Sequence, residues 1–140
     1  MLLLFNGANS FADGANFFIC PESPNCVSTE VDKKDNSHYV APFKVMGDSE
    51  AAWKKIRETV LSMPRTEIVE ERNFYFKAEV TSFVFRFVDD LEVSLDPETK
   101  SLSIKSASRV GYSDFGVNRE RVEGLRVLLN DQNILRINPG

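Results

Sequence analysis

The sequence predicts an α+β protein, a two-layer sandwich in which two helices cover one face of an antiparallel sheet of about five strands. Apolar residues recur at helical spacing over 49–62 and 118–130. Between these segments, four runs of residues show strand character, and short turns between the runs favour antiparallel pairing. The order strand, helix, four strands, helix suits a sheet with one covered face. The TATA-box-binding protein repeat has the same order, an analogy of fold that carries no function.

Length and composition limit the domain organisation and the class of partner. The 140 residues predict one domain over 20–130, with a flexible N-terminal lead-in over 1–19 and a C-terminal tail over 131–140. The formal net charge of −4 argues against nucleic-acid binding, which needs a basic footprint. No apolar run approaches the roughly 20 residues that cross a bilayer, so no transmembrane segment is expected. The first residues also lack the basic and apolar regions of a secretory signal.

The first half of the chain is predicted to contain one short strand and one helix. Residues 20–41 are rich in Pro, Ser, Asn and Asp and are expected to be irregular, whereas 43–45 form the strand. Asp48 offers an N-cap for the helix over 49–62. Trp53 lies on the apolar face of this helix and is expected to anchor the core.

The middle of the chain predicts four consecutive strands, over residues 66–71, 74–80, 83–95 and 101–105. In the third strand, Phe83, Phe85 and Phe87 share one face. The adjacent acids Asp89 and Asp90 predict a bulge that re-aims the second half of this strand. An exposed Phe row on the uncovered sheet face would indicate an interaction protein that uses its sheet.

The last part of the chain predicts a loop and a second helix. The loop over 106–117 contains two glycines, and the helix follows over 118–130. Gly124 lies in the middle of this helix, where it is expected to permit close packing against the sheet.

Two cysteines lie close together in the irregular segment. Five residues, two of them proline, separate Cys20 from Cys26 and favour a turn that brings the thiols within bonding reach. A small disulfide loop and two reduced thiols are both compatible with this spacing. A metal site is not expected, because zinc takes four ligands and the only other good donor is His38.

The densest group of polar residues spans the end of the last strand, the following loop and the start of the second helix. It predicts a ligand or partner patch formed by Arg109, Tyr112, Asp114, Asn118, Arg119 and Arg121, together with Asp89 and Asp90. Arginines beside a helix N-terminus favour a small anionic ligand or a protein partner. The alternative is an internal ion-pair network, in which the aspartates receive the arginines and pin the loop to the sheet.

These residues predict a non-enzymatic binding or assembly module more readily than an enzyme. The alternative is a small hydrolase or isomerase that uses Asp89 or Asp90 as base and Arg109 as an electrostatic clamp. Adjacent strand residues point to opposite faces, so the two acids should not converge unless a bulge turns one of them. No catalytic residue, metal or cofactor is assigned from the sequence, and the oligomeric state stays open.

Several segments carry a resemblance to a known family: Cys20–Ser28, His38, Ala52-Trp53, Phe85–Asp90, Ser106–Arg119 and Arg121–Glu123. Together they resemble the domain-of-unknown-function 1499 family (DUF1499) of bacteria and plants, over about residues 19–130. The resemblance implies no activity and no catalytic residues. It favours the disulfide, because family members often lie in exported, envelope or chloroplast contexts. It suggests an envelope, periplasmic or chloroplast location, although the chain carries no clear signal of its own.

Overall fold

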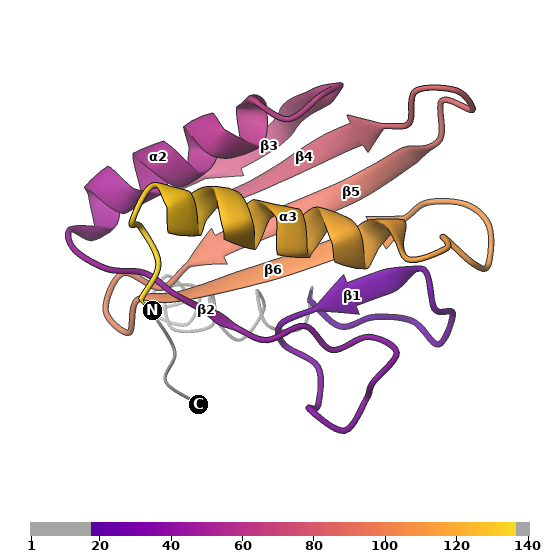
Figure 1. Cartoon of the computed structure of the whole chain (residues 1–140), viewed down its shortest axis with the longest axis horizontal. Helices are drawn as coiled ribbons and strands as arrows, with labels where there is room; N and C mark the ends of the chain where they lie inside the picture. The colour runs from indigo at the N-terminus through magenta and orange to yellow at the C-terminus, as the bar shows by residue number, and fades with distance from the viewer. Residues whose placement is uncertain (1–17, 137–140) are drawn as a thin grey trace, which may run out of the picture.

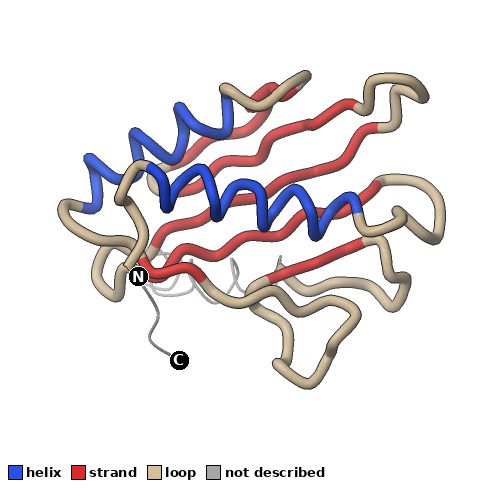
Figure 2. The backbone as a smooth tube through the Cα atoms, in the orientation of Figure 1, coloured by secondary structure: helices blue, strands red, loops and turns tan. Residues whose placement is uncertain are grey.

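The structure, a computed structural model that describes residues 18–136, has the predicted α+β class. Both helices lie on one face of a single sheet (Figures 1 and 2). The first 17 residues of the expected lead-in over 1–19, and the last four of the expected tail over 131–140, lie outside the described residues. In chain order the elements are β1 (Cys26–Ser28), β2 (Phe43–Lys44), α2 (Ser49–Leu61), β3 (Thr66–Arg72), β4 (Tyr75–Thr81), β5 (Val88–Leu95), β6 (Ser101–Ser108) and α3 (Val117–Asp131).

The sheet has six strands in the order β1-β6-β5-β4-β3, and β2 pairs with β6 beside β1. Every pair of these strands is antiparallel. The prediction that residues 20–41 are irregular was wrong at β1. A strand of three residues is too short to show an alternating pattern, and all three residues of β1 are buried. Its position depends on backbone pairing with β6, where Val27 lies opposite Ser106.

Helix α2 forms where the sequence predicts it. Asp48 caps its N-terminus, because the carboxylate accepts a hydrogen bond of 2.9 Å from the Ala51 N–H. Trp53 packs against Phe74 and Phe76, with ring centroids 6.0 and 5.3 Å apart. The helix therefore attaches to the sheet through an aromatic cluster.

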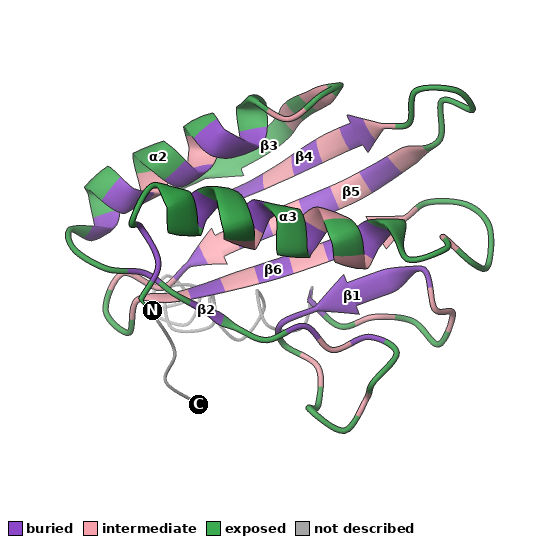
Figure 3. Ribbon diagram, viewed as in Figure 1, coloured by how far each residue is buried: buried purple, intermediate pink, exposed green. Residues whose placement is uncertain are grey.

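The core lies between the sheet and the two helices. Buried and half-buried residues alternate along β4, β5 and β6 (Figure 3), as expected for strands with one covered face. Ile56, Val122 and Leu125 fill the helix side. The chain after α3 also returns to the core, because Ile134 and Leu135 are buried. Leu135 forms an isolated antiparallel bridge with Val45, the residue after β2.

The expected strand over 83–95 was wrong in its first five residues. Strand β4 ends at Thr81, which pairs with Val88, so residues 82–87 have no partner strand and form the hairpin loop. The Ser82 N–H donates to the Phe87 carbonyl and the Phe87 N–H donates to Ser82 Oγ, which closes the loop. Arg86 adopts a positive φ of 60°, as a tight reversal requires.

The expected bulge at Asp89 and Asp90 was also wrong. Strand β5 pairs in unbroken register with both neighbours, and the shift in register lies in β3 between Ile68 and Glu70. Positions 89, 91, 93 and 95 all face the core. The alternation of core-facing and outward-facing residues therefore begins at Asp89 and continues unbroken along β5. Asp89 tolerates an inward position because an arginine pairs with it there.

Two further expectations about the C-terminal half were wrong. Strand β6 continues to Ser108 rather than ending at Lys105, because β1 adds a pairing partner for its last residues. Gly124 is exposed on α3, and a Cβ atom built there meets nothing within 4 Å. The glycine therefore does not serve close packing.

Candidate functional site

Asn118 is the centre of a buried polar network below the start of α3. Its side-chain oxygen accepts from Ser106 Oγ and from Arg121 Nη1, each at 2.7 Å. Its amide group donates to the Asn25 carbonyl, to Ser108 Oγ and to the Asp114 carboxylate. Asn118 is fully buried, so these five contacts satisfy an otherwise costly polar group. The network joins β1, β6 and α3 into one unit.

Arg121 and Asp89 extend this network into the space between α3 and the sheet. Arg121 donates to Asp89 at 2.9 Å and to Ser106 Oγ at 3.0 Å. Both members of the ion pair are shielded from solvent. The pair links α3 to the second residue of β5, and the two charged groups bond to each other inside the fold.

Asp114 caps α3 from the preceding loop. Its carboxylate accepts hydrogen bonds from the backbone N–H groups of Gly116 and Asn118. Burial opposes the charged carboxylate, but the hydrogen bonds from Asn118 and Gly116 outweigh it and lower the pKa of Asp114. Asp114 therefore holds the end of the β6–α3 loop.

Arg109 lies on the face of the sheet opposite the two helices. It donates to both carboxylate oxygens of Asp90, at 2.9 and 2.8 Å, and also contacts Glu79. The two carboxylates raise the pKa of Arg109. Because Asp89 points to the helix side and Asp90 to the open side, the two acids do not converge as a catalytic pair.

Arg119 and Tyr112 occupy two other positions. The Arg119 guanidinium donates to the carbonyls of Tyr39, Asn36 and Ser37, and so ties the 31–39 loop to α3. Tyr112 lies in the β6–α3 loop with 72% of its surface exposed. The eight residues of the predicted patch thus divide into a buried network, an open-face ion-pair cluster, a loop tie and one exposed ring, rather than sharing one surface.

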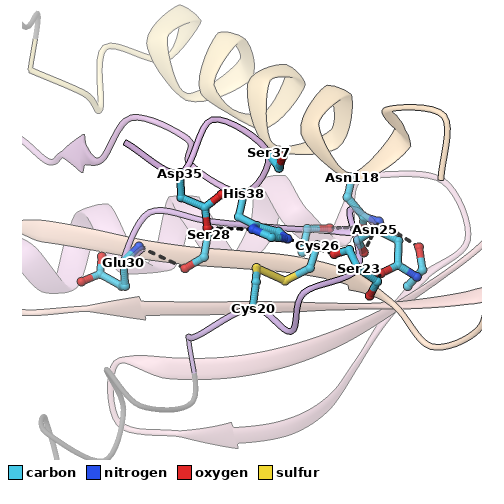
Figure 4. Close-up of a disulfide and its surroundings, with 12 residues drawn as sticks. Cys20, Ser23, Asn25, Cys26, Ser28, Glu30, Asp35, Ser37, His38 and Asn118 are labelled. Atoms are coloured by element: carbon cyan, nitrogen blue, oxygen red, sulfur yellow. Dashed lines mark hydrogen bonds and ion pairs between the residues drawn. A yellow bond between two sulfur atoms is a disulfide. The ribbon is translucent and has the colours of Figure 1, made fainter. Parts of the chain in front are cut away.

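The two cysteines form a disulfide, with a sulfur–sulfur distance of 2.06 Å (Figure 4). The loop that it closes carries Asn25, whose amide donates to the Gly111 carbonyl at 2.7 Å. The Asn25 carbonyl accepts from the Ser108 N–H as well as from Asn118. The disulfide loop therefore holds the β6–α3 loop in position.

His38 contacts the disulfide loop through its imidazole ring. Its Nδ1 lies 2.7 Å from the Asp35 carboxylate, and its Nε2 lies 2.9 Å from the Ser23 carbonyl (Figure 4). Burial lowers the pKa of His38, but the hydrogen bonds to Ser23 and Asp35 outweigh it and raise the pKa above 6.5. Both ring nitrogens face acceptors, which favours the imidazolium form.

The most exposed apolar residues lie in two loops. The sequence did not predict that these two loops leave the same end of the sheet. Phe83, Val84, Phe85 and Phe87 project from the β4–β5 loop, and Val110, Tyr112 and Phe115 from the β6–α3 loop. Asp89 pairs with Ser108, so both loops leave the same end of the sheet, as Figure 1 shows. The one available signal was Phe83-Val84-Phe85, three consecutive apolar residues. A half-exposed strand instead alternates apolar and polar residues. We call these residues the apolar loop end.

A shallow polar depression of about 310 Å³ lies beside the β4–β5 loop. It is lined by Arg65, Thr66, Glu67, Glu79, Thr81 and Arg86. Over residues 18–136, no group of three or more His, Cys, Asp and Glu side chains is arranged to hold a metal ion. No helix in that part of the chain has the length and apolar character needed to cross a membrane.

Comparison with protein families decides the classification. Residues 17–129 match the family model described as a protein of unknown function, DUF1499. The chain belongs to the DUF1499 family. The match covers the disulfide loop, all six strands, α2, and α3 up to Leu129 of this DUF1499 chain.

Comparisons of the DUF1499 chain with curated proteins and with solved structures find no significant match. The likeness to the TATA-box-binding protein repeat therefore remains an analogy drawn from element order. Family membership supplies no function, so a functional proposal rests on the geometry of this chain.

Proposed function

We propose that this DUF1499 chain is a binding or assembly module, not an enzyme, and that it makes contact through the apolar loop end. The observation that carries this proposal is the exposure of Phe83, Phe85 and Phe115, at 73%, 73% and 93%. Groups of large, exposed apolar side chains are typical of interaction sites. Here they come from two loops that leave the same end of the sheet.

The predicted polar patch acts in this proposal as the support of that surface. Asp114 and Asn118 fix the end of the β6–α3 loop, and Asn25 fixes its start through Gly111. Arg109 and Tyr112 are the members of the patch that stay accessible to a partner. A loop with so many internal hydrogen bonds presents its exposed rings in a defined arrangement, which lowers the entropic cost of binding.

The arrangement of the acids favours a binding role over the hydrolase or isomerase alternative. Asp89 is held by Arg121 inside the fold, and Asp90 is held by Arg109 and approached by Lys77 at 3.9 Å on the open face. A general base needs access to its substrate and a free lone pair. These carboxylates are instead engaged on opposite sides of the sheet.

A position-specific photocrosslinking experiment tests the proposed function. A photoreactive phenylalanine analogue replaces Phe85 or Phe115 in the full chain, expressed in the source organism, and Val127 serves as the control. Val127 is 57% exposed but lies on α3, away from the loop end. We expect a light-dependent adduct of defined mass, protein or lipid, from the two loop positions only. Equal background at all three positions would overturn the proposal.

A further inference from the structure

We propose that the apolar loop end docks on the surface of a lipid bilayer that contains anionic lipids. This inference rests on the proposed function and names its partner. The aromatic tips of the β4–β5 and β6–α3 loops would enter the headgroup and upper acyl region. The arginines at the base of the first loop would meet lipid phosphates.

The shape of the surface favours a bilayer as the acceptor. The exposed apolar residues belong to two separate loops, and both loops leave the end of the sheet where Asp89 pairs with Ser108 (Figure 1). Such loop tips need an acceptor that closes around them. A fluid bilayer does so without a pre-formed groove, whereas a protein partner must supply two matching pockets.

The residue types also match the membrane interface. Phe85 and Phe87 stack with ring centroids 5.6 Å apart and form one apolar block on the first loop. Tyr112 on the second loop is 72% exposed and combines an apolar ring with a polar hydroxyl, the combination that prefers the headgroup level. Shallow insertion of such loops removes apolar area from water, as in other interfacial anchors.

Positive charge lies beside the β4–β5 loop. The Arg65 guanidinium lies 5.4 Å from the centroid of the Phe83 ring and donates to the Thr81 carbonyl. Arg65 and Arg86 line the depression beside the loop. Of the two acids in its lining, Glu79 is already paired with Arg109. The depression thus offers two guanidinium groups beside the β4–β5 loop, where they can pair with anionic headgroups.

Vesicle flotation with the full, disulfide-bonded chain tests the inference. The probes are phosphatidylcholine vesicles, with and without one quarter phosphatidylglycerol. We compare the native sequence with the double variant Phe85→Ser/Phe115→Ser, with Arg86→Gln, and with Val127→Ser/Leu128→Ser. The last variant removes two apolar side chains of 57% and 42% exposure from α3 and is the matched control. Circular dichroism and the fluorescence of Trp53 verify the fold of each variant.

We expect the native chain and the α3 control to float with the anionic vesicles. The double Phe variant should lose affinity by about tenfold or more, because each Phe gives up a large apolar area. Arg86→Gln should weaken binding to the anionic vesicles, and added salt should weaken binding of the native chain, through loss of headgroup attraction. Failure of the native chain to bind either vesicle, or equal binding by the double Phe variant, would overturn the inference.

The two proposals fail in different ways. If vesicles do not bind but the analogue at Phe85 or Phe115 captures one protein, the lipid inference is wrong and the binding-module proposal stands. If neither experiment gives a result that depends on these positions, both are wrong.

Discussion

The guanidinium of Arg121 donates to the carboxylate of Asp89 over 2.9 Å, and each side chain is only 11% exposed. This contact joins the second turn of α3 to the start of β5, the middle strand of the sheet order. Charges removed from water depend on each other, since the loss of one leaves the other without compensation. The pair is therefore a place where single substitutions should be costly.

We expect Asp89→Ala to lower the free energy of unfolding by about 3 kcal/mol, because it leaves the Arg121 charge buried without its partner. Urea unfolding followed by Trp53 fluorescence measures the change. Glu71→Ala is the control: it breaks the Arg57 ion pair, whose members are 39% and 38% exposed, and should cost less than about 1 kcal/mol. Equal losses in the two variants would show that the buried pair has no special role.

The disulfide should stabilise the chain and the β6–α3 loop together. Reduction of Cys20–Cys26 should lower the free energy of unfolding by about 2 kcal/mol, as expected for a short closed loop. The Ser108 amide, which donates to the Asn25 carbonyl, should then exchange its hydrogen faster.

Hydrogen exchange followed by mass spectrometry compares the oxidised chain with Cys20→Ser/Cys26→Ser. Amides of α2 (Ser49–Leu61) serve as the internal reference. Unchanged exchange near Ser108 would contradict the proposed link. Intact mass before and after reduction should differ by about 2 Da, the two thiol hydrogens.

His38 should make stability depend on pH. Its folded pKa lies above the unfolded value of 6.5, so the charged ring binds its proton more tightly in the folded chain. The stabilisation is fully present below about pH 6.5 and is lost as the pH rises through the folded pKa. Because the chain has one histidine, its ring proton resonance reports this group directly. A folded-state midpoint at or below the midpoint in urea would show that burial outweighs the hydrogen bonds.

Gly124→Ala should stabilise the protein by about 1 kcal/mol. The glycine lies within α3, and an added Cβ meets nothing within 4 Å, so the helix gains propensity without a clash. Gly116→Ala is the contrasting variant, because Gly116 has a φ of 83°, and it should destabilise by about 1 kcal/mol. Thermal unfolding of the two variants checks the opposite signs.

Local pattern predicted most of the fold. The helical spacing and the Asp48 cap gave α2, and strict alternation gave β4, because side-chain period and capping are properties of short segments. The extended assignment of residues 83–87 was wrong for a related reason. Whether an alternating segment is a strand depends on a partner strand, and β4 ends at Thr81.

The candidate site was less predictable, since its residues meet through long-range contacts. The sequence indicated that Asp89 and Asp90 lie near the arginines, but the pairing of one with Arg121 and the other with Arg109 depends on the two faces of the sheet. Asn25 gave no signal, because its role comes from contacts with Gly111 and Asn118, 86 and 93 residues away.

By itself, the sequence determined the α+β class, the family, both helices and the acidic balance of the chain. Periodicity, composition and short motifs are all properties of residues that lie close together in the sequence. Only the tertiary structure decided that Cys20 and Cys26 are bonded, that Asn118 and Arg121 bond within the fold, and that the loops of Phe85 and Phe115 leave the same end of the sheet. Those relations depend on strand register and on the packing of α3 over the sheet, which bring distant residues together.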